Sequence, residues 1–244
     1  MKPEETKVRI LEAADQLFGE LGFDATSTRD IAERSGINKA LIHYHFGTKD
    51  ELLEQVLDGY YARLTAALLA ALGRRACPQE QAAELLDAYA DFLAANRTFC
   101  SIVQREVASG HHVEKIVQGT LPVFRLGTAW LGHLAPDAPE GLELVHLFTT
   151  VYGMVVTYFT YGRVLQQLSG VDPFSPAALE SRKRHVRRVV ALLFRELRES
   201  TGASPADRTG PGVRPRSEPV ARPKKEGKPW PRSTPRTQRK KAAS

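Results

Sequence analysis

The chain has 244 residues, 42% hydrophobic and 25% charged, so it can bury one sizeable core or two small ones. It contains no apolar run of about eighteen residues, and its first residues lack the apolar segment of a secretory signal. Its two cysteines, Cys77 and Cys100, cannot staple a fold of this size and suit a reducing compartment. These features exclude a membrane or disulfide-rich secreted class and predict a cytoplasmic protein.

The net charge of +6 is concentrated at one end of the chain. Residues 203–244 carry 12 Lys and Arg against 3 Asp and Glu, whereas residues 1–202 carry 22 against 25. The basic balance therefore belongs to the last segment. Any binding of nucleic acid by the rest of the chain must come from a local patch.

The first predicted helix covers about Glu4 to Leu21, where apolar residues recur with helical spacing between charged ones. Gly22 ends it, and Phe23 is expected to fold back onto it. This helix is predicted to support the two short helices that follow, because helices of this length need mutual packing in water.

The next stretch, TSTRDIAERSGINKALIHYHFGTK, has the spacing of two short helices joined by a tight turn. Ser27, three residues before Asp30, is a capping-box start, and Gly36 supplies the left-handed residue that ends the helix. Asn38 can then cap a second helix, Lys39–Phe46. This spacing fits a helix-turn-helix, whose second helix enters the major groove of DNA.

Six more helices are predicted from apolar periodicity and from breakers such as Gly73, Asn96, Gly110 and the GVDPFSP stretch. Their expected spans are a Thr48-capped helix to Leu72, then Gln79–Ala95, Thr98–Ser109, His111 to about Ala135, Glu140 to about Leu168, and Pro176 to about Glu199. The segment Pro136 to Pro139 is expected to be a loop. No stretch alternates apolar and polar residues with the period of two typical of a β-strand over more than a few residues. The prediction is therefore an all-α protein of about nine helices.

Residues 203–244 contain eight prolines and almost no aliphatic side chains. Such a composition cannot bury enough surface to offset its conformational entropy, so a disordered basic tail is predicted. Two roles remain open: a strongly salt-dependent, nonspecific hold on DNA, or a solubilising extension.

The order of residues from LEAADQLFGELGF through the helix-turn-helix to TKDELLEQVL resembles the N-terminal region of the TetR/AcrR family of bacterial transcription regulators. The resemblance covers about Lys7 to Leu57. It rests on an Ile-Ala pair, a turn glycine, an aromatic-rich end of the second short helix and a following Lys. Beyond Leu57 it is one of architecture. The implied domains are a helix-turn-helix domain, 1–47, and a helical effector-binding and dimerisation domain, 48–202, followed by the tail.

The resemblance implies DNA contacts at both helix starts and along the second helix. Thr28 and Lys49 would meet phosphates, Lys39 can reach guanine acceptors, and Ala40 can meet a thymine methyl. His43 stands where the family usually has a tyrosine, so a phosphate contact there would depend on pH. Phe46 is expected to pack in the core, and for His45 both roles stay open. The full set comprises Ser27, Thr28, Arg29, Asn38, Lys39, Ala40, Leu41, His43, Tyr44, His45 and Lys49.

The resemblance also implies a small-molecule pocket among the middle helices and a homodimer formed by the last two predicted helices, about 140–168 and 176–199. Polar groups among apolar helical faces are the pocket candidates. The pocket prediction comprises Gln104, Arg105, Thr149, Tyr152 and Tyr158, within a wider set that also includes Tyr89, His133 and His146. For any single residue of these, a surface or satisfied core role is the competing interpretation.

Metal and enzyme signatures are weak, so no metal site, cofactor or catalytic residue is predicted. His43 and His45 lie two apart on one helix and point to different faces, and His111 and His112 are adjacent, without a cysteine cluster. The chain has neither a phosphate-cradling glycine loop nor an HExxH motif.

The predicted function is that of a sequence-specific, DNA-binding transcriptional regulator, a dimeric repressor released from a palindromic operator by an unknown small-molecule effector. Three alternatives remain open: an activator of the same fold, a nonspecific DNA-binding protein driven by the tail, and an all-α enzyme or binding module that keeps the helix-turn-helix as scaffold. The effector, the operator sequence and the regulated genes are not encoded in any motif.

Overall fold

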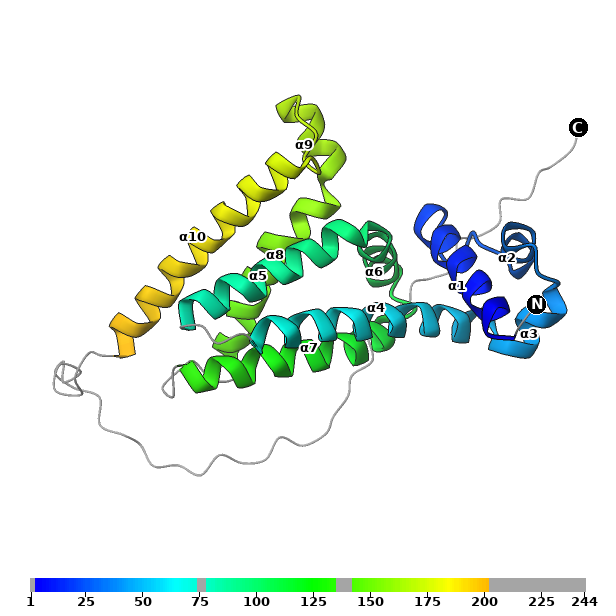
Figure 1. The fold of residues 1–244 in the computed structure, drawn as a ribbon, viewed down its shortest axis with the longest axis horizontal. Coiled ribbons are helices and arrows are strands. Elements are labelled where there is room, and N and C mark those ends of the chain that lie inside the picture. The colour runs from blue at the N-terminus through cyan, green and yellow to red at the C-terminus, as the bar shows by residue number, and fades with distance from the viewer. Residues whose placement is uncertain (1–2, 74–77, 135–141, 202–244) are drawn as a thin grey trace, which may run out of the picture. The chain divides into compact units, whose positions relative to one another are not determined.

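A computed structural model of the chain describes residues 3–73, 78–134 and 142–201. These residues form ten α-helices and contain no strand, and they belong to the first of the two units into which the chain divides, Met1–Ser204. Within this unit, Figure 1 shows the N-terminal helices gathered at one end and the later, mostly longer helices running alongside one another at the other. The all-α class predicted from the sequence is confirmed.

The three N-terminal helices are α1 (Pro3–Glu20), α2 (Thr28–Ser35) and α3 (Lys39–Phe46), at the predicted positions. Because helices of eight residues are unstable alone in water, their mutual packing holds α2 and α3 in place. The core that they share is almost fully buried and includes Ile10, Ala14, Phe18, Ile31, Ile42 and Phe46.

The long helix α4 (Lys49–Leu72) leads out of this group into the rest of the unit. It begins with a capping box, in which the Thr48 hydroxyl accepts from the Glu51 amide and the Glu51 carboxylate accepts from the Thr48 backbone N–H at 2.7 Å. Along its length α4 packs on α1, on α5 (Pro78–Ala95) and on α7 (Val113–Leu134).

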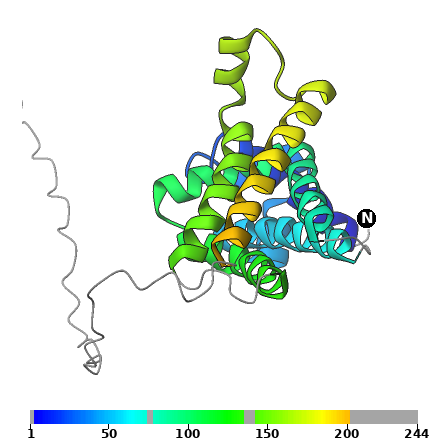
Figure 2. The ribbon, with the colours of Figure 1, turned by 90° about the vertical axis from the view of Figure 1, so that its left-hand side faces the viewer.

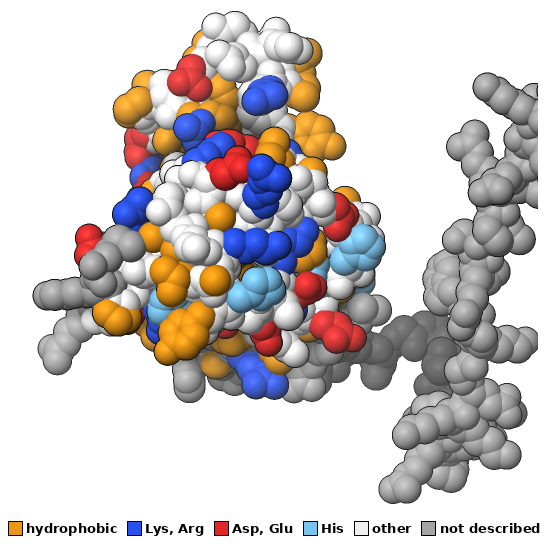
Figure 3. All heavy atoms as spheres, turned by 90° about the vertical axis from the view of Figure 1, so that its right-hand side faces the viewer, with side chains coloured by type: hydrophobic (Ala, Val, Ile, Leu, Met, Phe, Trp, Pro, Cys, Tyr) orange, Lys and Arg blue, Asp and Glu red, His pale blue; other side chains and the backbone are white. Residues whose placement is uncertain are grey.

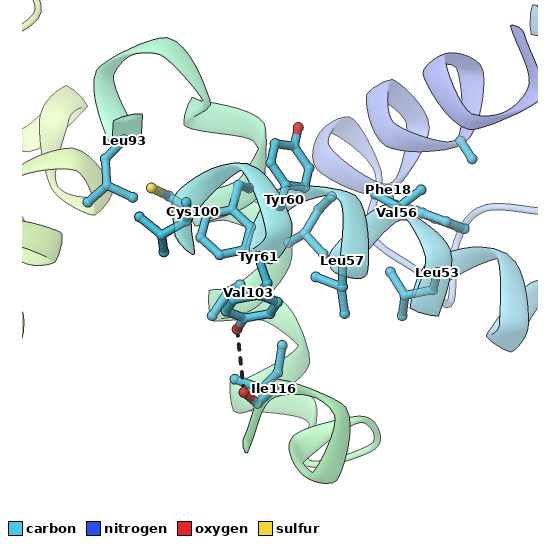
Figure 4. Close-up of a cluster of buried hydrophobic side chains, with 14 of the residues drawn as sticks. Phe18, Leu53, Val56, Leu57, Tyr60, Tyr61, Leu93, Cys100, Val103 and Ile116 are labelled. Atoms are coloured by element: carbon cyan, nitrogen blue, oxygen red, sulfur yellow. Dashed lines mark hydrogen bonds between the residues drawn. The ribbon is translucent and has the colours of Figure 1, made fainter. Parts of the chain in front are cut away.

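The buried side of α4 makes the two parts of the unit share one hydrophobic core. Figure 4 shows Leu53 and Val56 beside Phe18 of α1, and Tyr61 further along the helix beside Val103. All of these side chains belong to a single buried cluster. A displacement of α4 against its neighbours would therefore disturb packing at both ends of the unit.

The remaining helices are α6 (Arg97–Ser109), α8 (Leu142–Thr160), α9 (Gly162–Ser169) and α10 (Pro176–Thr201). Helix α10 packs on α5 and α8, and Figure 2 shows α8 and α10 side by side with α9 projecting beyond them. Apart from one break, the observed bounds lie within a few residues of those predicted from the sequence.

The break separates α8 from α9, where a single helix from Glu140 to about Leu168 was expected, so the helices number ten rather than about nine. At Tyr161 the backbone (φ −96°, ψ 15°) leaves the helical region. Gly162 then passes so close to Phe174 that a Cβ would lie 2.2 Å from its ring. Only glycine tolerates this approach. An isolated glycine within an apolar helical pattern does not by itself predict a break between two helices.

The predicted loop from Pro136 to Pro139 and the predicted disordered tail from residue 203 lie outside the described residues. Among the helices that the structure describes, none combines the length and the apolar content needed to cross a membrane.

Candidate DNA-binding surface and internal cavity

Local hydrogen bonds fix the geometry of the helix-turn-helix. The Ser27 hydroxyl accepts from the Asp30 amide. The Asp30 carboxylate accepts from the Ser27 hydroxyl at 2.7 Å and from the Ser27 backbone N–H at 2.8 Å, and these two bonds lower the pKa of that carboxyl. Gly36 ends α2 at φ +66°, and Asn38 caps α3 by accepting from the Ala40 amide at 2.9 Å. Ser27 and Asn38 thus hold the helix starts, and their DNA contacts stay predictions.

Helix α3 turns a face with charged and hydrogen-bonding groups to the solvent. Lys39, Ala40 and His43 are exposed, and Tyr44 is 81% exposed, with its ring in an edge-on contact with that of His45. A tyrosine so poorly covered contributes little to folding, which points to a role in contacting a partner. Figure 3 shows Lys and Arg side chains gathered at this end of the molecule, beside histidine and hydrophobic side chains.

At the start of α2, Thr28 is partly buried and Arg29 is exposed. Arg29 pairs with Glu33, one turn along the helix, at 3.1 Å. Exposed pairs at this spacing contribute only about 0.2–0.5 kcal/mol. The guanidinium of Arg29 can therefore leave Glu33 for a phosphate at small cost.

The ammonium of Lys49 is engaged inside the protein. Its Nζ donates to the carbonyl oxygens of Phe23 at 2.7 Å and Thr26 at 2.8 Å, and it lies 4.1 Å from the centroid of the Phe23 ring. These bonds attach the start of α4 to the turn after α1. The predicted phosphate contact of Lys49 remains a prediction, to which the structure adds this internal role.

Two further predicted residues differ in exposure. His45 is partly buried, with its ring against Phe46, and Leu41, expected as an apolar contact, has 41% of its side chain exposed beside the free face of α3. Leu41 is therefore available for apolar contact with DNA.

A buried acid and a histidine connect the turn after α6 to the first turn of α4. The carboxylate of the buried Glu106 lies 2.5 Å from Nδ1 of His112, and Nε2 of the same ring lies 3.0 Å from the Asp50 carboxylate. Lys115 adds hydrogen bonds to the Asp50 carbonyl oxygen and to Glu54. Burial lowers the pKa of His112, but the hydrogen bonds and charges of the two carboxylates outweigh it and raise that pKa overall.

Within the described residues, no group of three or more His, Cys, Asp or Glu side chains is arranged to hold a metal ion. The thiol of Cys100 is buried, and this burial raises its pKa to about 12. A thiol with such a pKa stays protonated near neutral pH and makes a poor nucleophile.

A cavity of about 220 Å³ lies among helices α4 to α8 and α10. Its walls are mostly Leu, Val and Phe side chains, and among the described residues that line it none carries a charge. An apolar cavity of about 150 Å³ is known to accommodate benzene, so this one has room for a small organic molecule.

Of the residues predicted for an effector pocket, Gln104 and Tyr152 line the cavity, as does Tyr89 of the wider set. The other predicted residues lie elsewhere. Arg105 donates to the Glu20 carbonyl oxygen, Thr149 is exposed, and the Tyr158 hydroxyl donates to the Pro173 carbonyl oxygen. Exposed His146 is not among the lining residues, and the side chain of His133 lies outside those described.

The sequence analysis missed four polar residues of the cavity wall, Tyr61, Cys100, Thr120 and Thr128. One signal was present for Tyr61. It follows Tyr60 directly on a helix, and two adjacent aromatic residues must point to different faces. Tyr60 packs on α1, with its hydroxyl donating to Asp15 at 2.6 Å, which leaves Tyr61 to turn toward the middle helices.

Comparison with known proteins agrees with this geometry. The sequence profile described as "Bacterial regulatory proteins, tetR family" matches residues 10–56, which span α2, α3 and parts of α1 and α4. The HTH-type transcriptional repressor Rv3405c of Mycobacterium tuberculosis is 31% identical over 169 residues, covering 69% of this chain and 80% of that protein. The HTH-type transcriptional regulator TtgR of Pseudomonas putida is 38% identical over 58 residues, covering 24% and 28%.

Solved structures share the fold at low identity. The fatty acid degradation regulator FadR from Bacillus halodurans superposes with a TM-score of 0.61 at 17% identity, covering 75% of this chain and 94% of that one. A TetR-like transcriptional regulator from Rhodococcus sp. RHA1 gives 0.60 at 18% identity, covering 81% and 96%.

The fold and the exposed face of α3 thus define a DNA-binding transcriptional regulator of the helix-turn-helix class. Within that class, the chain belongs to the TetR family of bacterial regulatory proteins.

Proposed function

We propose that this regulator is a homodimeric repressor that covers a palindromic operator and leaves it when a small molecule occupies the cavity. The observation that carries the proposal is the exposed face of α3, held by a capped turn and a buried core. The name of the Mycobacterium tuberculosis relative, a repressor, supports repression over activation. We also propose that the helix-turn-helix domain ends near residue 47, that the effector and dimer domain covers 48–202, and that 203–244 form the tail.

The proposed DNA contacts divide into two groups. Thr28, Arg29, His43 and Lys49 contact phosphates and fix the register, together with the backbone around Ser27 and Asn38. Lys39, Ala40, Leu41, Tyr44 and His45 lie toward the groove, where Lys39 bonds guanine acceptors and Ala40 meets a thymine methyl. The exposure of most of these side chains in the free protein supports this division.

The proposed dimer forms through the last two predicted helices, 140–168 and 176–199, which correspond to α8 with α9 and to α10. Apolar side chains on these helices stand in solvent in the single chain, including Leu168 at 79% exposure and Leu192 at 50%. A two-fold dimer would cover such surfaces and place two copies of α3 about one DNA turn apart, roughly 34–36 Å.

Release by an effector requires that the ligand favour the arrangement of the two α3 helices that does not fit DNA. Helix α4 supports this link, because it contributes Tyr61 to the cavity wall and begins three residues after α3 ends. An occupant that shifts α4 would shift α3 with it.

The test is fluorescence-anisotropy binding of the purified chain to a random duplex library and to DNA upstream of its own coding region, at two salt concentrations. We expect a two-fold symmetric site whose preference over random DNA survives the higher salt. Sequence-blind binding that vanishes with salt would refute the proposal and favour nonspecific binding by the tail. Activation rather than repression would appear as reporter expression that falls when the gene is deleted.

A further inference from the structure

The cavity wall contains polar side chains from five different helices. They are Tyr61 from α4, Tyr89 from α5, Cys100 and Gln104 from α6, Thr120 and Thr128 from α7, and Tyr152 from α8. Figure 4 shows Tyr61 and Cys100 within the buried cluster that borders it. Polar groups from such separate elements come together only when the fold is complete, and they interrupt a wall that is otherwise aliphatic and aromatic.

The three tyrosine hydroxyls of the cavity wall differ in their hydrogen-bond partners. Tyr61 lies 3.2 Å from the Thr120 hydroxyl and donates to the Ile116 carbonyl oxygen at 3.5 Å. Among the described residues, the hydroxyls of Tyr89 and Tyr152 have no hydrogen-bond partner. Neither hydroxyl is among the fully buried side-chain atoms that lack a partner in that part of the chain, so neither is sealed within the protein. Two free hydroxyls are therefore available to an occupant of the cavity.

The environment keeps these phenols neutral. Burial, followed by the neighbouring Tyr152, Cys100 and Tyr61 groups, raises the pKa of Tyr89 well above its ordinary value. Burial also raises the pKa of Tyr152. Each hydroxyl can thus donate a hydrogen bond throughout the physiological pH range, and neither supplies a charge.

The same wall disfavours a charged occupant. A carboxylate or ammonium entering the cavity would lose hydration and find no opposite charge among the lining residues that the structure describes. A neutral carbonyl, ester or ether oxygen loses much less hydration and gains the two donors. An entirely apolar molecule would leave both hydroxyls without partners.

We infer that the cavity takes an uncharged, mainly apolar molecule with one hydrogen-bond acceptor, which the Tyr89 and Tyr152 hydroxyls hold. Scaling from benzene in about 150 Å³ gives an occupant of about nine non-hydrogen atoms in 220 Å³. This inference rests on the proposed function in one respect only, namely that the occupant of the cavity is the effector.

The test compares three molecules of similar size by isothermal titration calorimetry with the full chain near pH 7.5. Propiophenone is a neutral ketone, propylbenzene lacks the acceptor, and 3-phenylpropanoate is anionic. We expect the ketone to bind at least about tenfold more tightly than the anion, and several-fold more tightly than propylbenzene. Equal or tighter binding of the anion, or binding of none of the three, overturns the inference.

The variants Tyr89→Phe and Tyr152→Phe locate the acceptor site while keeping the ring that packs. Each is expected to weaken ketone binding by about three- to tenfold, and to leave propylbenzene binding equal or tighter because no hydroxyl is then left without a partner. Tyr161→Phe is the matched control, because Tyr161 is exposed and lies outside the cavity wall. Unchanged ketone affinity in both cavity variants contradicts the assigned hydroxyls. DNA binding of the same preparations without ligand reports separately on the proposed function.

Discussion

Tyr44 and Phe46 stand two residues apart on α3 and separate DNA binding from folding. Tyr44 is 81% exposed, whereas Phe46 is 3% exposed in the core of the three N-terminal helices. We expect Tyr44→Ala to weaken operator binding by about 1–3 kcal/mol without a change in thermal stability. Phe46→Ala is expected to cost about 3–5 kcal/mol of unfolding free energy. Anisotropy and thermal unfolding of both variants check the pair, and normal operator binding by Tyr44→Ala would remove this residue from the interface.

At the residue scale, local chemistry was predictable and long-range partners were not. The caps at Ser27, Asn38 and Thr48 follow from residue type and spacing, since a capping side chain bonds a backbone amide two or three residues away. The partners of Lys49 are carbonyl oxygens more than twenty residues away. Nothing near Lys49 in the sequence indicates which of its possible partners the fold will bring within reach.

At the scale of elements, α4 and α7 cross where Gly119 meets Tyr61. A Cβ at Gly119 would lie 2.2 Å from the Tyr61 ring, so Gly119→Ala forces the helices apart or displaces that ring. We expect Gly119→Ala to cost about 1–3 kcal/mol in denaturant unfolding. The matched control is Gly127→Ala on the same helix, where a Cβ meets nothing within 4 Å. Higher helix propensity should make that change neutral or stabilising by up to about 1 kcal/mol. Equal effects of the two substitutions would show that the crossing is not tight.

The stability contributed by the hydrogen bonds of His112 to Asp50 of α4 and to Glu106 should depend on pH. Burial lowers the pKa of His112, but Asp50 and Glu106 raise it overall, so protonation stabilises the folded state. The contribution is complete below the unfolded value of about 6.5 and is lost as the pH rises through the folded pKa. The Asp50 contribution has the opposite dependence: its pKa is lowered, chiefly by the hydrogen bond from His112, so it is lost under acidic conditions.

Thermal unfolding at pH 6 and pH 8 tests this dependence. The charged neighbours are Asp50 and Glu106 on the ring and Lys115 on the Asp50 backbone. The protein should lose more stability between pH 6 and 8 than His112→Gln, which cannot gain a proton. His111→Gln is the control, since His111 is exposed and lies 3.7 Å from Asp24. If His112→Gln lost as much stability between pH 6 and 8 as the unsubstituted protein, the proposed contribution of protonated His112 would be refuted.

The elements themselves were largely predictable, because apolar periodicity and breaker residues act within a few positions of the chain. What the sequence did not indicate depends on distant contacts. The start of α9 at Gly162 lies against the ring of Phe174, and the cavity wall is assembled from six helices. Of the predicted pocket residues, Gln104 and Tyr152 face the cavity, whereas Arg105 is directed to α1 by a carbonyl oxygen that periodicity could not identify.

For the whole molecule, the proposed dimer can be tested on α10. Leu192 is 50% exposed on a helix that packs against α8, so Leu192→Glu places a charge in the proposed interface without disturbing the single chain. We expect this variant to shift toward monomer in analytical ultracentrifugation and to lose operator affinity in parallel. Val117→Glu, at a residue 55% exposed on α7, should do neither. Dimers that persist in Leu192→Glu would place the interface elsewhere.

The charge distribution leads to the last prediction, which concerns how DNA affinity divides along the chain. Residues 203–244 carry a net charge of +9, and residues 1–202 carry a net charge of −3. Each phosphate that a basic side chain neutralises adds about 0.9 to the slope of log affinity against log salt. A chain ending at residue 202 should therefore bind all DNA more weakly at low salt and show a smaller slope, if the tail contacts phosphates.

The chain ending at residue 202 should keep its preference for the operator over a scrambled duplex, because α3 and not the tail is proposed to contact the bases. Titrations of both chain lengths against both duplexes at several salt concentrations separate these quantities. An unchanged slope would make the tail a solubilising extension, since its charges would then release no counterions from DNA. Loss of the preference itself would contradict the assignment of base recognition to α3.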